Sequence, residues 1–382
     1  MNPLRILFVF GCPLKKGGTE NVMINIVKNI DRDRFHIDFL IFDKTPDQSD
    51  DKKYLESLGC RFYQITARGV DRKLHNRELD EFFRDHEYDI VHTHMDAIGE
   101  EALKAAKKHG IKALIAHSHN TDQLDNPKGL KDHLHKCYLI YEKHLLRRYA
   151  EYFVACSPEA GKWLFGDKIC NSEKYLLLKN SIDSSAYAYD EETRNAVRKE
   201  LGLEGRKVVI HVGQFRTQKN HGKVIDVFNE LHKRDDSFAL VLVGTGEEQD
   251  KIKAKAEELG LKEDVLFLGN RNDIPGLLTA SDIFLFPSLY EGLPIALLEA
   301  QAADLICVVS DTISEVALLT EKVKSLSLSA SPSVWADVTE AMMKEYNVRC
   351  DRREFFIEKG FDINAQIKVL ESFYMKAAGY ER

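Results

Sequence analysis

The segment whose residues are best suited to chemistry is a loop and helix start near residue 290, which carries two glutamates eight positions apart. Glu291 follows an apolar run that ends at Phe286, and Pro294 suits the first turn of a helix. Glu299 then falls more than one turn inside that helix among apolar neighbours, where a buried carboxylate needs a partner. Because an ionised carboxylate accepts from two hydroxyls at once, sugar hydroxyls are suitable partners. Two exposed acidic side chains are the simpler alternative.

A basic segment with a glycine follows another apolar run, Val208–Val212. Gly213 allows a tight turn, and Arg216 and Lys219 stand just before an expected helix start. Cations at a helix start can bind a diphosphate, which carries two or more negative charges. The same pattern also fits a solvated basic loop. The run Gly17-Gly18-Thr19-Glu20, after the first apolar run of the chain, is a weaker signal for an anion site, because a plain tight turn explains it equally well.

Histidines gather at the end of a further apolar run, Ala113–Ala116. His117 and His119 are two residues apart, so their side chains share one face and can reach a ligand. A zinc site is conceivable there, with His92 and His94 as further ligands. We nevertheless expect no metal site, because the loops carry no Asp-x-Asp pair of the kind that a nucleotide-bound metal needs.

The elements that must position these residues are short apolar runs that alternate with amphipathic stretches, a pattern typical of parallel sheets covered by helices on both faces. Before a linker at Asn180–Tyr189, the expected strands are Ile6–Phe10, Ile37–Phe42, Asp89–His92, Ala113–Ala116 and Tyr152–Ala155, and the expected helices include Glu20–Ile30, Leu74–Arg84 and Glu100–His109. After the linker, the expected strands are Val208–Val212, Ala239–Val243, Val265–Leu268, Ile283–Phe286 and Ile306–Val309, and the expected helices are Lys223–Lys233, Gln249–Leu259, Pro294–Ala302, Trp335–Tyr346 and Phe361–Lys376.

This alternation predicts two Rossmann-like, doubly wound α/β domains, 1–183 and 184–360. A C-terminal helix, 361–382, is expected to pack back toward the first domain. In doubly wound sheets a ligand binds outside the carboxyl ends of the strands, so the site is expected in the cleft between the two domains.

The composition is that of an ordinary globular protein, with 44% hydrophobic and 30% charged residues. The formal net charge of -7 argues against a nucleic-acid partner. The seven cysteines form no CxxC pair and are expected to be buried free thiols in a reducing compartment. No apolar run approaches the roughly 18 residues of a membrane span, so the expected location is the cytoplasm.

One long expected helix, Leu130–Tyr149, is rich in cationic side chains: Lys131, His133, His135, Lys136, Lys143, His144, Arg147 and Arg148. Its apolar residues recur at helical spacing: Leu134, Cys137, Tyr138, Tyr141, Leu145 and Leu146. It is either a surface helix that packs one side on the sheet or a basic face near an anionic acceptor or lipid headgroups. Peripheral contact with the inner face of the membrane is therefore one of two alternatives.

Taken together, these segments resemble family 4 of the retaining glycosyltransferases, which has the GT-B fold, over nearly the whole chain. The corresponding family motifs are the E-x7-E motif (Glu291–Glu299), the GGxE loop (Gly17–Glu20), the phosphate loop (Gly213–Lys219), the strand-end histidine (Ala116–Asn120) and the linker motif (Asn180–Asp183). The combination is highly specific, although each piece is not. The segments Lys219–His221 and Ser310–Ile313 are most similar to bacterial capsule and exopolysaccharide transferases.

The resemblance implies a role for each matching residue of the second domain. Lys219 is expected to bind the donor diphosphate, and Glu299 the ribose hydroxyls. Glu291, with the backbone amides of Gly292 and Leu293, is expected to hold the donor hexose. The nucleobase pocket is expected at Asn270, Arg271 and Asp273.

In the first domain, the resemblance places His119 near the donor sugar and the reaction centre, and Gly18 beside the phosphates. The implied catalytic residues are His119, Lys219 and Glu291. Two positions depart from the family pattern. Gln214 stands where an arginine is usual, so Arg216 is expected to supply that charge. Asp304 stands in a segment that often has glycine and is expected to alter a turn rather than the chemistry.

The implied activity is a metal-independent, retaining transfer of a hexose from a nucleotide-diphosphate sugar, with UDP as the default. The implied acceptor is a glycan or lipid-linked glycan in polysaccharide biosynthesis, held by the first domain, and no cofactor is implied. Without a metal, cationic side chains and helix N-termini must stabilise the leaving diphosphate. One alternative is a sugar-nucleotide epimerase of the same architecture, and another is a non-catalytic nucleotide-sugar-binding subunit. A dinucleotide oxidoreductase is disfavoured, because no Gly-x-Gly-x-x-Gly follows the first strand.

Overall fold

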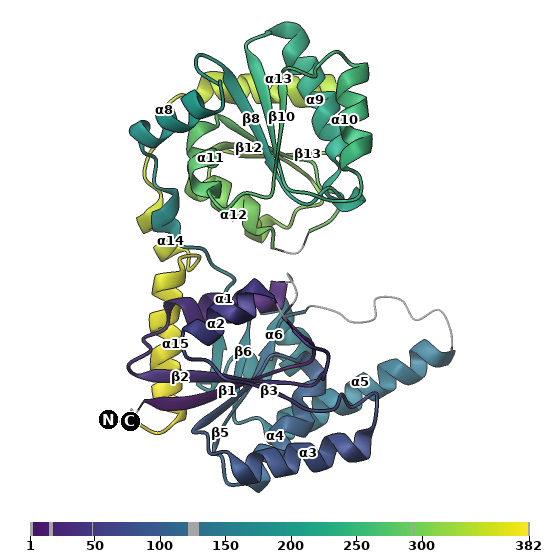
Figure 1. The fold of residues 1–382 in the computed structure, drawn as a ribbon, viewed down its shortest axis with the longest axis vertical. Helices are drawn as coiled ribbons and strands as arrows, with labels where there is room; N and C mark the ends of the chain where they lie inside the picture. Colours follow the sequence, from purple (N-terminus) through teal and green to yellow (C-terminus); the bar gives the residue numbers. More distant parts are fainter. Residues whose placement is uncertain (1–2, 15–17, 48, 121–129, 292, 381–382) are drawn as a thin grey trace. The chain divides into compact units, whose positions relative to one another are not determined.

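The computed structural model describes residues 3–14, 18–47, 49–120, 130–291 and 293–380, which form two compact units. Unit 1 takes the chain up to Asn180 and from Ile363 onward, and unit 2 is Ser181–Asp362. Each unit is a parallel sheet with helices on both faces (Figure 1). Two Rossmann-like α/β domains are therefore confirmed. The unit boundaries at Asn180 and Asp362 lie close to the expected 183 and 360.

The sheet of unit 1 has seven parallel strands in the order β3-β2-β1-β4-β5-β6-β7. Its strands are β1 (Leu4–Phe10), β2 (Phe35–Ile41), β3 (Phe62–Gln64), β4 (Ile90–Thr93), β5 (Ala113–Ser118), β6 (Tyr152–Ala155) and β7 (Tyr175–Leu177). The direction of winding reverses between β1 and β4, which pair with each other. Ligands of doubly wound sheets bind beside the carboxyl ends of strands at such a reversal.

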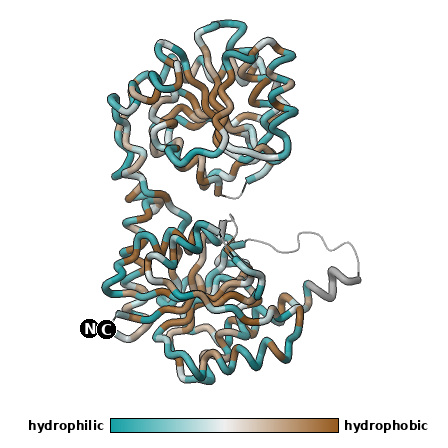
Figure 2. Tube along the Cα trace, in the orientation of Figure 1, coloured by the Kyte–Doolittle hydropathy of each residue, from teal (hydrophilic) through white to brown (hydrophobic). Residues whose placement is uncertain are grey.

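Helices on both faces of this sheet bury two apolar clusters. The helices of unit 1 are α1 (Gly18–Asn29), α2 (Asp50–Ser57), α3 (Arg72–Asp85), α4 (Glu100–Lys108), α5 (Leu130–Tyr149), α6 (Pro158–Phe165), α7 (Asp167–Cys170) and α15 (Ile363–Ala377), with a short 3-10 helix at Asp96–Gly99. Side chains of α1 and α15 contribute to one cluster, and side chains of α3 to α6 contribute to the other. Hydrophobic segments run through the sheets of both units (Figure 2).

The C-terminal helix α15 belongs to unit 1 although the chain reaches it through unit 2. Its Tyr374 is fully buried, and the phenol oxygen lies 2.8 Å from Nδ1 of His92 on β4. Glu371 accepts a hydrogen bond of 2.8 Å from the backbone amide of Asp31. These contacts and the buried apolar side of α15 anchor the end of the chain on the first sheet (Figure 1).

Unit 2 has six parallel strands in the order β10-β9-β8-β11-β12-β13, and the winding reverses between β8 and β11. The strands are β8 (Lys207–Val212), β9 (Phe238–Val243), β10 (Val265–Gly269), β11 (Ile283–Phe286), β12 (Ile306–Ser310) and β13 (Val323–Leu326). The helices are α8 (Glu191–Glu200), α9 (His221–Arg234), α10 (Gln249–Glu258), α11 (Ile274–Ala280), α12 (Ile295–Ala302), α13 (Pro332–Glu345) and α14 (Arg353–Glu358), and the 3-10 helices are Ser184–Tyr187, Thr217–Lys219 and Glu315–Ala317.

The cysteines are all free thiols, as expected, but the expectation that they are buried is wrong for most of them. Only Cys60 and Cys307 are buried, whereas Cys137 and Cys350 are exposed. Within the described part of the chain, no helix combines the length and the apolar character needed to cross a bilayer.

Asp304, which follows α12, lies in a turn, and its buried carboxylate also forms ion pairs with two cationic side chains. Its φ of 56° is left-handed, a conformation that Asp tolerates better than most residues and that glycine usually takes after a helix. One carboxylate oxygen accepts from Lys322 Nζ at 2.7 Å, and the other accepts from Arg352 Nε at 2.7 Å. Burial acts to raise the pKa of Asp304, but these bonds and the Cys350 amide outweigh it and hold the pKa below its ordinary value.

We expect Asp304→Asn to lower the free energy of unfolding by about 3–5 kcal/mol, because it leaves buried Lys322 without its counter-charge and removes one of the two carboxylates that pair with half-buried Arg352. The asparagine keeps the left-handed turn, so the loss reports the charge alone. In the parent protein this stabilisation is present above the ordinary Asp pKa of 3.8 and is lost as the pH falls through the lower folded value. Denaturant unfolding at neutral and acidic pH checks both statements, and Asp311→Asn on the surface is the control. Equal stability of the two variants at neutral pH would contradict them.

Candidate active site

The predicted diphosphate-binding and sugar-binding loops of unit 2 follow β8 and β11, the two strands at which the sheet reverses direction. The sheet therefore brings together segments that are about seventy residues apart in the chain. The backbone amide of Leu289 donates to the backbone carbonyl of Gln218 at 2.8 Å, and the side-chain amide of Gln218 donates to the backbone carbonyl of Tyr290 at 2.9 Å. Asn220, in a left-handed conformation, donates to the Pro287 carbonyl at 3.1 Å. These bonds make the two loops one structural unit.

Lys219 and Glu291 form an ion pair within this unit, with 2.7 Å between Nζ and Oε1. The side chains are 19% and 9% exposed, so the pair is shielded but open to a ligand. The ammonium also lies 4.7 Å from the centre of the Phe286 ring. A lysine has three donors, so two remain for another acceptor after the bond to Glu291. The geometry holds a positive charge at the loop before α9.

Glycines make room for this arrangement at two positions. A Cβ on Gly213 would lie 3.1 Å from the Lys219 stem, which packs against it. Gly244, after β9, has a φ of 133°, and a Cβ there would lie 2.1 Å from the Gly213 carbonyl oxygen. No other residue fits at Gly244 without moving the backbone of the loop that carries Lys219. The requirement for glycine at position 244 therefore depends on its contact with the loop after β8.

Glu299 lies in α12, where its carboxylate is half-buried and accepts a hydrogen bond of 2.7 Å from the Tyr187 hydroxyl. Burial raises the pKa of Glu299, and the hydrogen bond from Tyr187 opposes that rise. Tyr187 comes from the segment expected to be only a linker, and sequence reasoning missed it. Its partner is 112 positions away in the chain, so no local signal could identify the pair.

The remaining predicted donor-binding residues on the loops of unit 2 are Arg216, Asn270, Arg271 and Asp273. Arg216 is exposed, and no ion pair to its guanidinium occurs among residues 3–14, 18–47, 49–120, 130–291 and 293–380. Asn270, Arg271 and Asp273 follow the edge strand β10 rather than the central strands. Arg271 pairs with Asp273 at 2.6 Å, and Asn270 accepts from Thr245 at 3.3 Å.

Three further predicted residues are Gly292, Gly18 and Leu293. Gly292 lies outside the described residues, and Gly18 is described only as the first residue of α1. Leu293 is half-buried beside the start of α12.

In unit 1, His119 lies directly after β5 and is held by its neighbours. Its backbone amide donates to Asp96 at 2.7 Å, and its Nε2 lies 3.0 Å from Nδ1 of His94. Asp96 is buried with a φ of 47°, and it also accepts from the Asn120 side chain at 2.6 Å. Burial lowers the pKa of His119 to about 3 and raises the pKa of Asp96. Asp96 was not singled out in the sequence, where it stands in a short loop without a motif.

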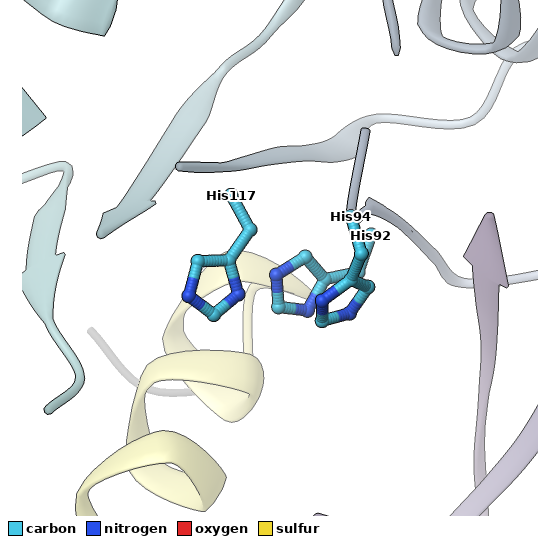
Figure 3. Close-up of side chains that lie close together, drawn as sticks. All are labelled: His92, His94 and His117. Atoms are coloured by element: carbon cyan, nitrogen blue, oxygen red, sulfur yellow. The ribbon is translucent and has the colours of Figure 1, made fainter. Parts of the chain in front are cut away.

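His119 is the outermost of four packed imidazoles. His92, His94 and His117 are buried beneath it and face one another beside α15 (Figure 3). The rings of His117 and His119 are 4.0 Å apart, centre to centre, and those of His92 and His94 are 4.3 Å apart. Burial lowers the pKa of all three inner histidines well below the ordinary value. The sequence indicated the shared face of these residues, and the structure brings the two strands' pairs into one cluster.

Helix α5 has a basic, partly apolar outer side. Lys136, Ile140, His144 and Arg148 are exposed at helical spacing. Tyr141, one of the apolar residues at helical spacing, is 57% exposed, whereas Leu139 and Leu146 are buried. Lys131, His133 and His135 have no described side-chain environment.

Comparisons with known proteins cover both halves of the chain. The family model described as Glycosyltransferase Family 4 matches residues 16–186, and the one described as Glycosyl transferases group 1 matches residues 193–360. EpsF of Bacillus subtilis (strain 168), which carries a glycosyltransferase name, is 32% identical over 378 residues, covering 97% of this chain and 96% of its own length. A UDP-Gal:alpha-D-GlcNAc-diphosphoundecaprenol alpha-1,3-galactosyltransferase of Escherichia coli is 32% identical over 61% of this chain and 60% of its own length.

The fold has a close counterpart among solved structures. Anabaena Alr3699/HepE in complex with UDP superposes with a TM-score of 0.70 at 20% identity, covering 98% of this chain and 97% of the other. This likeness extends over both units and identifies the fold as GT-B. Together with the family models and the full-length relative, it leads to one conclusion: the chain belongs to family 4 of the glycosyltransferases.

Proposed function

We propose that this glycosyltransferase moves a hexose from a UDP-sugar to a glycan or lipid-linked glycan in exopolysaccharide or capsule synthesis, with retention at the anomeric carbon. The observation that carries the proposal is the shielded Lys219–Glu291 pair between the two loops of unit 2. It supplies a cation for the diphosphate and a carboxylate for the hexose at one place. The UDP in the HepE complex and the undecaprenol-linked acceptor of the galactosyltransferase relative support the donor and acceptor classes.

In this proposal, Lys219 binds the diphosphate, assisted by Arg216 and by the N-terminal end of α9. Glu299, oriented by Tyr187, accepts from the ribose hydroxyls. Glu291 and the amides near Leu293 hold the hexose. Asn270, Arg271 and Asp273 contact the base, and in unit 1 His119 is assigned to the donor sugar and the reaction centre and Gly18 to the phosphates.

Charge on the leaving group is the central problem of the reaction. As the bond from the anomeric carbon to the diphosphate breaks, negative charge grows on the diphosphate and the sugar becomes oxocarbenium-like. Lys219 and the α9 dipole stabilise that charge without a metal ion. The acceptor oxygen bonds to the face that the diphosphate leaves, and its proton passes to the departing diphosphate. This order of events retains the anomeric configuration.

A thermal-shift screen tests the donor. We expect UDP and a UDP-hexose to raise the unfolding midpoint, because a ligand that binds only the folded state stabilises it by mass action. The shift should be the same with and without added Mg²⁺, since the proposed site holds the diphosphate with cationic side chains. Shifts that occur only with Mg²⁺ would contradict the metal-independent donor site, and equal shifts with unrelated dinucleotides would contradict the proposal itself.

The stereochemistry has its own test. We expect a proton NMR spectrum of the isolated product to show the same anomeric configuration as the donor. Release of nucleoside diphosphate in step with product separates this activity from epimerisation. An inverted product would overturn the retaining mechanism while leaving the donor assignment intact.

The exposed side of α5 supports a further part of the proposal, peripheral contact with an anionic membrane surface. Ile140 and Tyr141 are exposed among cationic side chains, a combination typical of interfacial helices. Binding to anionic but not to neutral vesicles, weakened in Arg147→Glu, is the expected result. Equal binding of the protein to anionic and neutral vesicles would contradict the proposed membrane contact.

A further inference from the structure

The histidine cluster in the core of unit 1 has a geometry that packing alone does not explain. His92 and His94 project from β4 and its end, and His117 projects from the neighbouring strand β5. One ring nitrogen from each residue lies within 4.8 Å of the other two. All three side chains are at most 3% exposed, so the nitrogens converge in the interior of the unit (Figure 3).

The hydrogen bonds of the cluster leave at least one ring nitrogen of each histidine without a partner. His92 uses Nδ1 for Tyr374 at 2.8 Å, and His94 uses Nδ1 for His119 at 3.0 Å. Nε2 of both residues and both ring nitrogens of His117 have no hydrogen-bond partner among the described residues. A buried polar atom without a partner is unfavourable, and four such atoms lie in this one cluster.

We propose that His92, His94 and His117 bind one divalent transition-metal ion of the Zn²⁺ class. Imidazole is a preferred ligand of this class, and three histidines with a water molecule make a tetrahedral set. Zn–N bonds of about 2.0–2.1 Å place tetrahedral ligand atoms about 3.4 Å apart. The nitrogens, at up to 4.8 Å, must therefore close by up to about 1.4 Å, which ring rotation can supply.

The outer contacts match what a metal-ligating histidine needs. Such a histidine almost always donates its second ring N–H to a neighbour, which fixes its tautomer and orientation. With Nε2 on the ion, His92 donates Nδ1–H to the Tyr374 oxygen on α15, and His94 donates Nδ1–H to Nε2 of His119. His119 then carries its own proton on Nδ1. The ion thereby orients His119 and tethers α15 to β4.

The site lies in unit 1, whereas the Lys219–Glu291 pair and Glu299 of the proposed donor site lie in unit 2. It departs from the expectation, based on the sequence, that the chain binds no metal. The proposal that the cluster binds a metal does not rest on the proposed function. Only the benefit of an oriented His119 to the reaction rests on it.

The experiment uses the full-length protein, stripped with a chelator and dialysed, and Zn²⁺ as the probe. We expect elemental analysis to find about one zinc ion per chain after reloading and desalting, and the unfolding midpoint to rise with zinc. Co²⁺ in place of zinc should give the visible absorption bands of tetrahedral cobalt, which a surface-bound ion would not. These readouts do not involve activity, so they stand whether or not the proposed reaction occurs.

His117→Leu is the decisive variant, because His117 makes no hydrogen bond that the change would remove. We expect the variant to be at least as stable as the parent without metal, and to lose zinc affinity by more than the ~10- to 100-fold that loss of an outer partner causes. His75→Gln, at another fully buried histidine of unit 1, should keep full zinc content. Parent protein that takes up no zinc, or a His117→Leu variant that binds as the parent does, would overturn the proposal and leave a packed cluster that at most encloses a water molecule.

Discussion

Lys219→Ala is expected to lower the turnover number by about 100- to 1000-fold, the range seen when one preorganised donor to a developing negative charge is removed. The lysine is positioned before any ligand arrives. Its stem packs on Gly213, its ammonium lies over Phe286, and Glu291 accepts from it at 2.7 Å. Such a group stabilises the leaving diphosphate without reorganising during the reaction, so its loss is felt mainly in the transition state.

Lys207→Ala is the matched control for this prediction. Lys207 is the first residue of β8, whereas Lys219 lies in the loop that follows the last residue of this strand. Lys207 forms a similar pair with Asp235 at 2.6 Å. Both variants lose one lysine and one partly exposed ion pair, yet only Lys219 lies beside the proposed donor. Steady-state kinetics and thermal unfolding of both variants are the measurements. Turnover within a few-fold of the parent in Lys219→Ala, or equal losses in the two variants, would remove the assigned role.

Glu299→Gln is expected to weaken the binding of a nucleoside diphosphate by about 10- to 150-fold. Hydrogen bonds to a charged group contribute about 1.5–3 kcal/mol, which corresponds to that range. The glutamine can still accept from Tyr187, but it has one acceptor oxygen in place of two and no charge. The ribose hydroxyls therefore lose their acceptor while the local packing is preserved.

A ligand that lacks both ribose hydroxyls isolates this contact. We expect a 2′,3′-dideoxynucleoside diphosphate to bind the parent and Glu299→Gln with similar affinity, because the variant then removes nothing that the ligand uses. Calorimetric titration of both ligands against both proteins completes the cycle. Glu340→Gln, on the exposed side of α13, is the control for loss of a carboxylate. A variant that weakens both ligands equally would show that Glu299 acts through the fold rather than on the ribose.

The central strands could be predicted because they are buried on both faces and therefore appear as uninterrupted apolar runs. Expected and observed ranges agree closely, as for Ile283–Phe286, which is the observed range of the central strand β11. The strands that sequence reasoning missed are β3, β7 and β13, which lie at sheet edges. They are three or four residues long and only partly buried, so no long apolar run marks them.

The motif spacing located the candidate donor residues, but it could not show how they interact. Lys219 and Glu291 are partners because β8 and β11 are neighbours at the reversal of the sheet. Tyr187 reaches Glu299 from a segment that has no periodicity. Gly244 is required because its φ is 133° and because another loop passes 2.1 Å from where its Cβ would stand. Each of these depends on a contact between segments distant in the chain.

Hydrophobic periodicity and motif spacing are properties of neighbouring positions, so the two α/β units, the family and the loops that carry the candidate residues could be inferred without a structure. Which of those residues act together follows from tertiary contacts. Parallel strands that are remote in sequence end at the same edge of a sheet, and there the chain assembles the Lys219–Glu291 pair, the Tyr187–Glu299 contact and the convergent nitrogens of His92, His94 and His117. Charge shielding and unpaired buried nitrogens arise from that convergence, and no local stretch of the chain contains them.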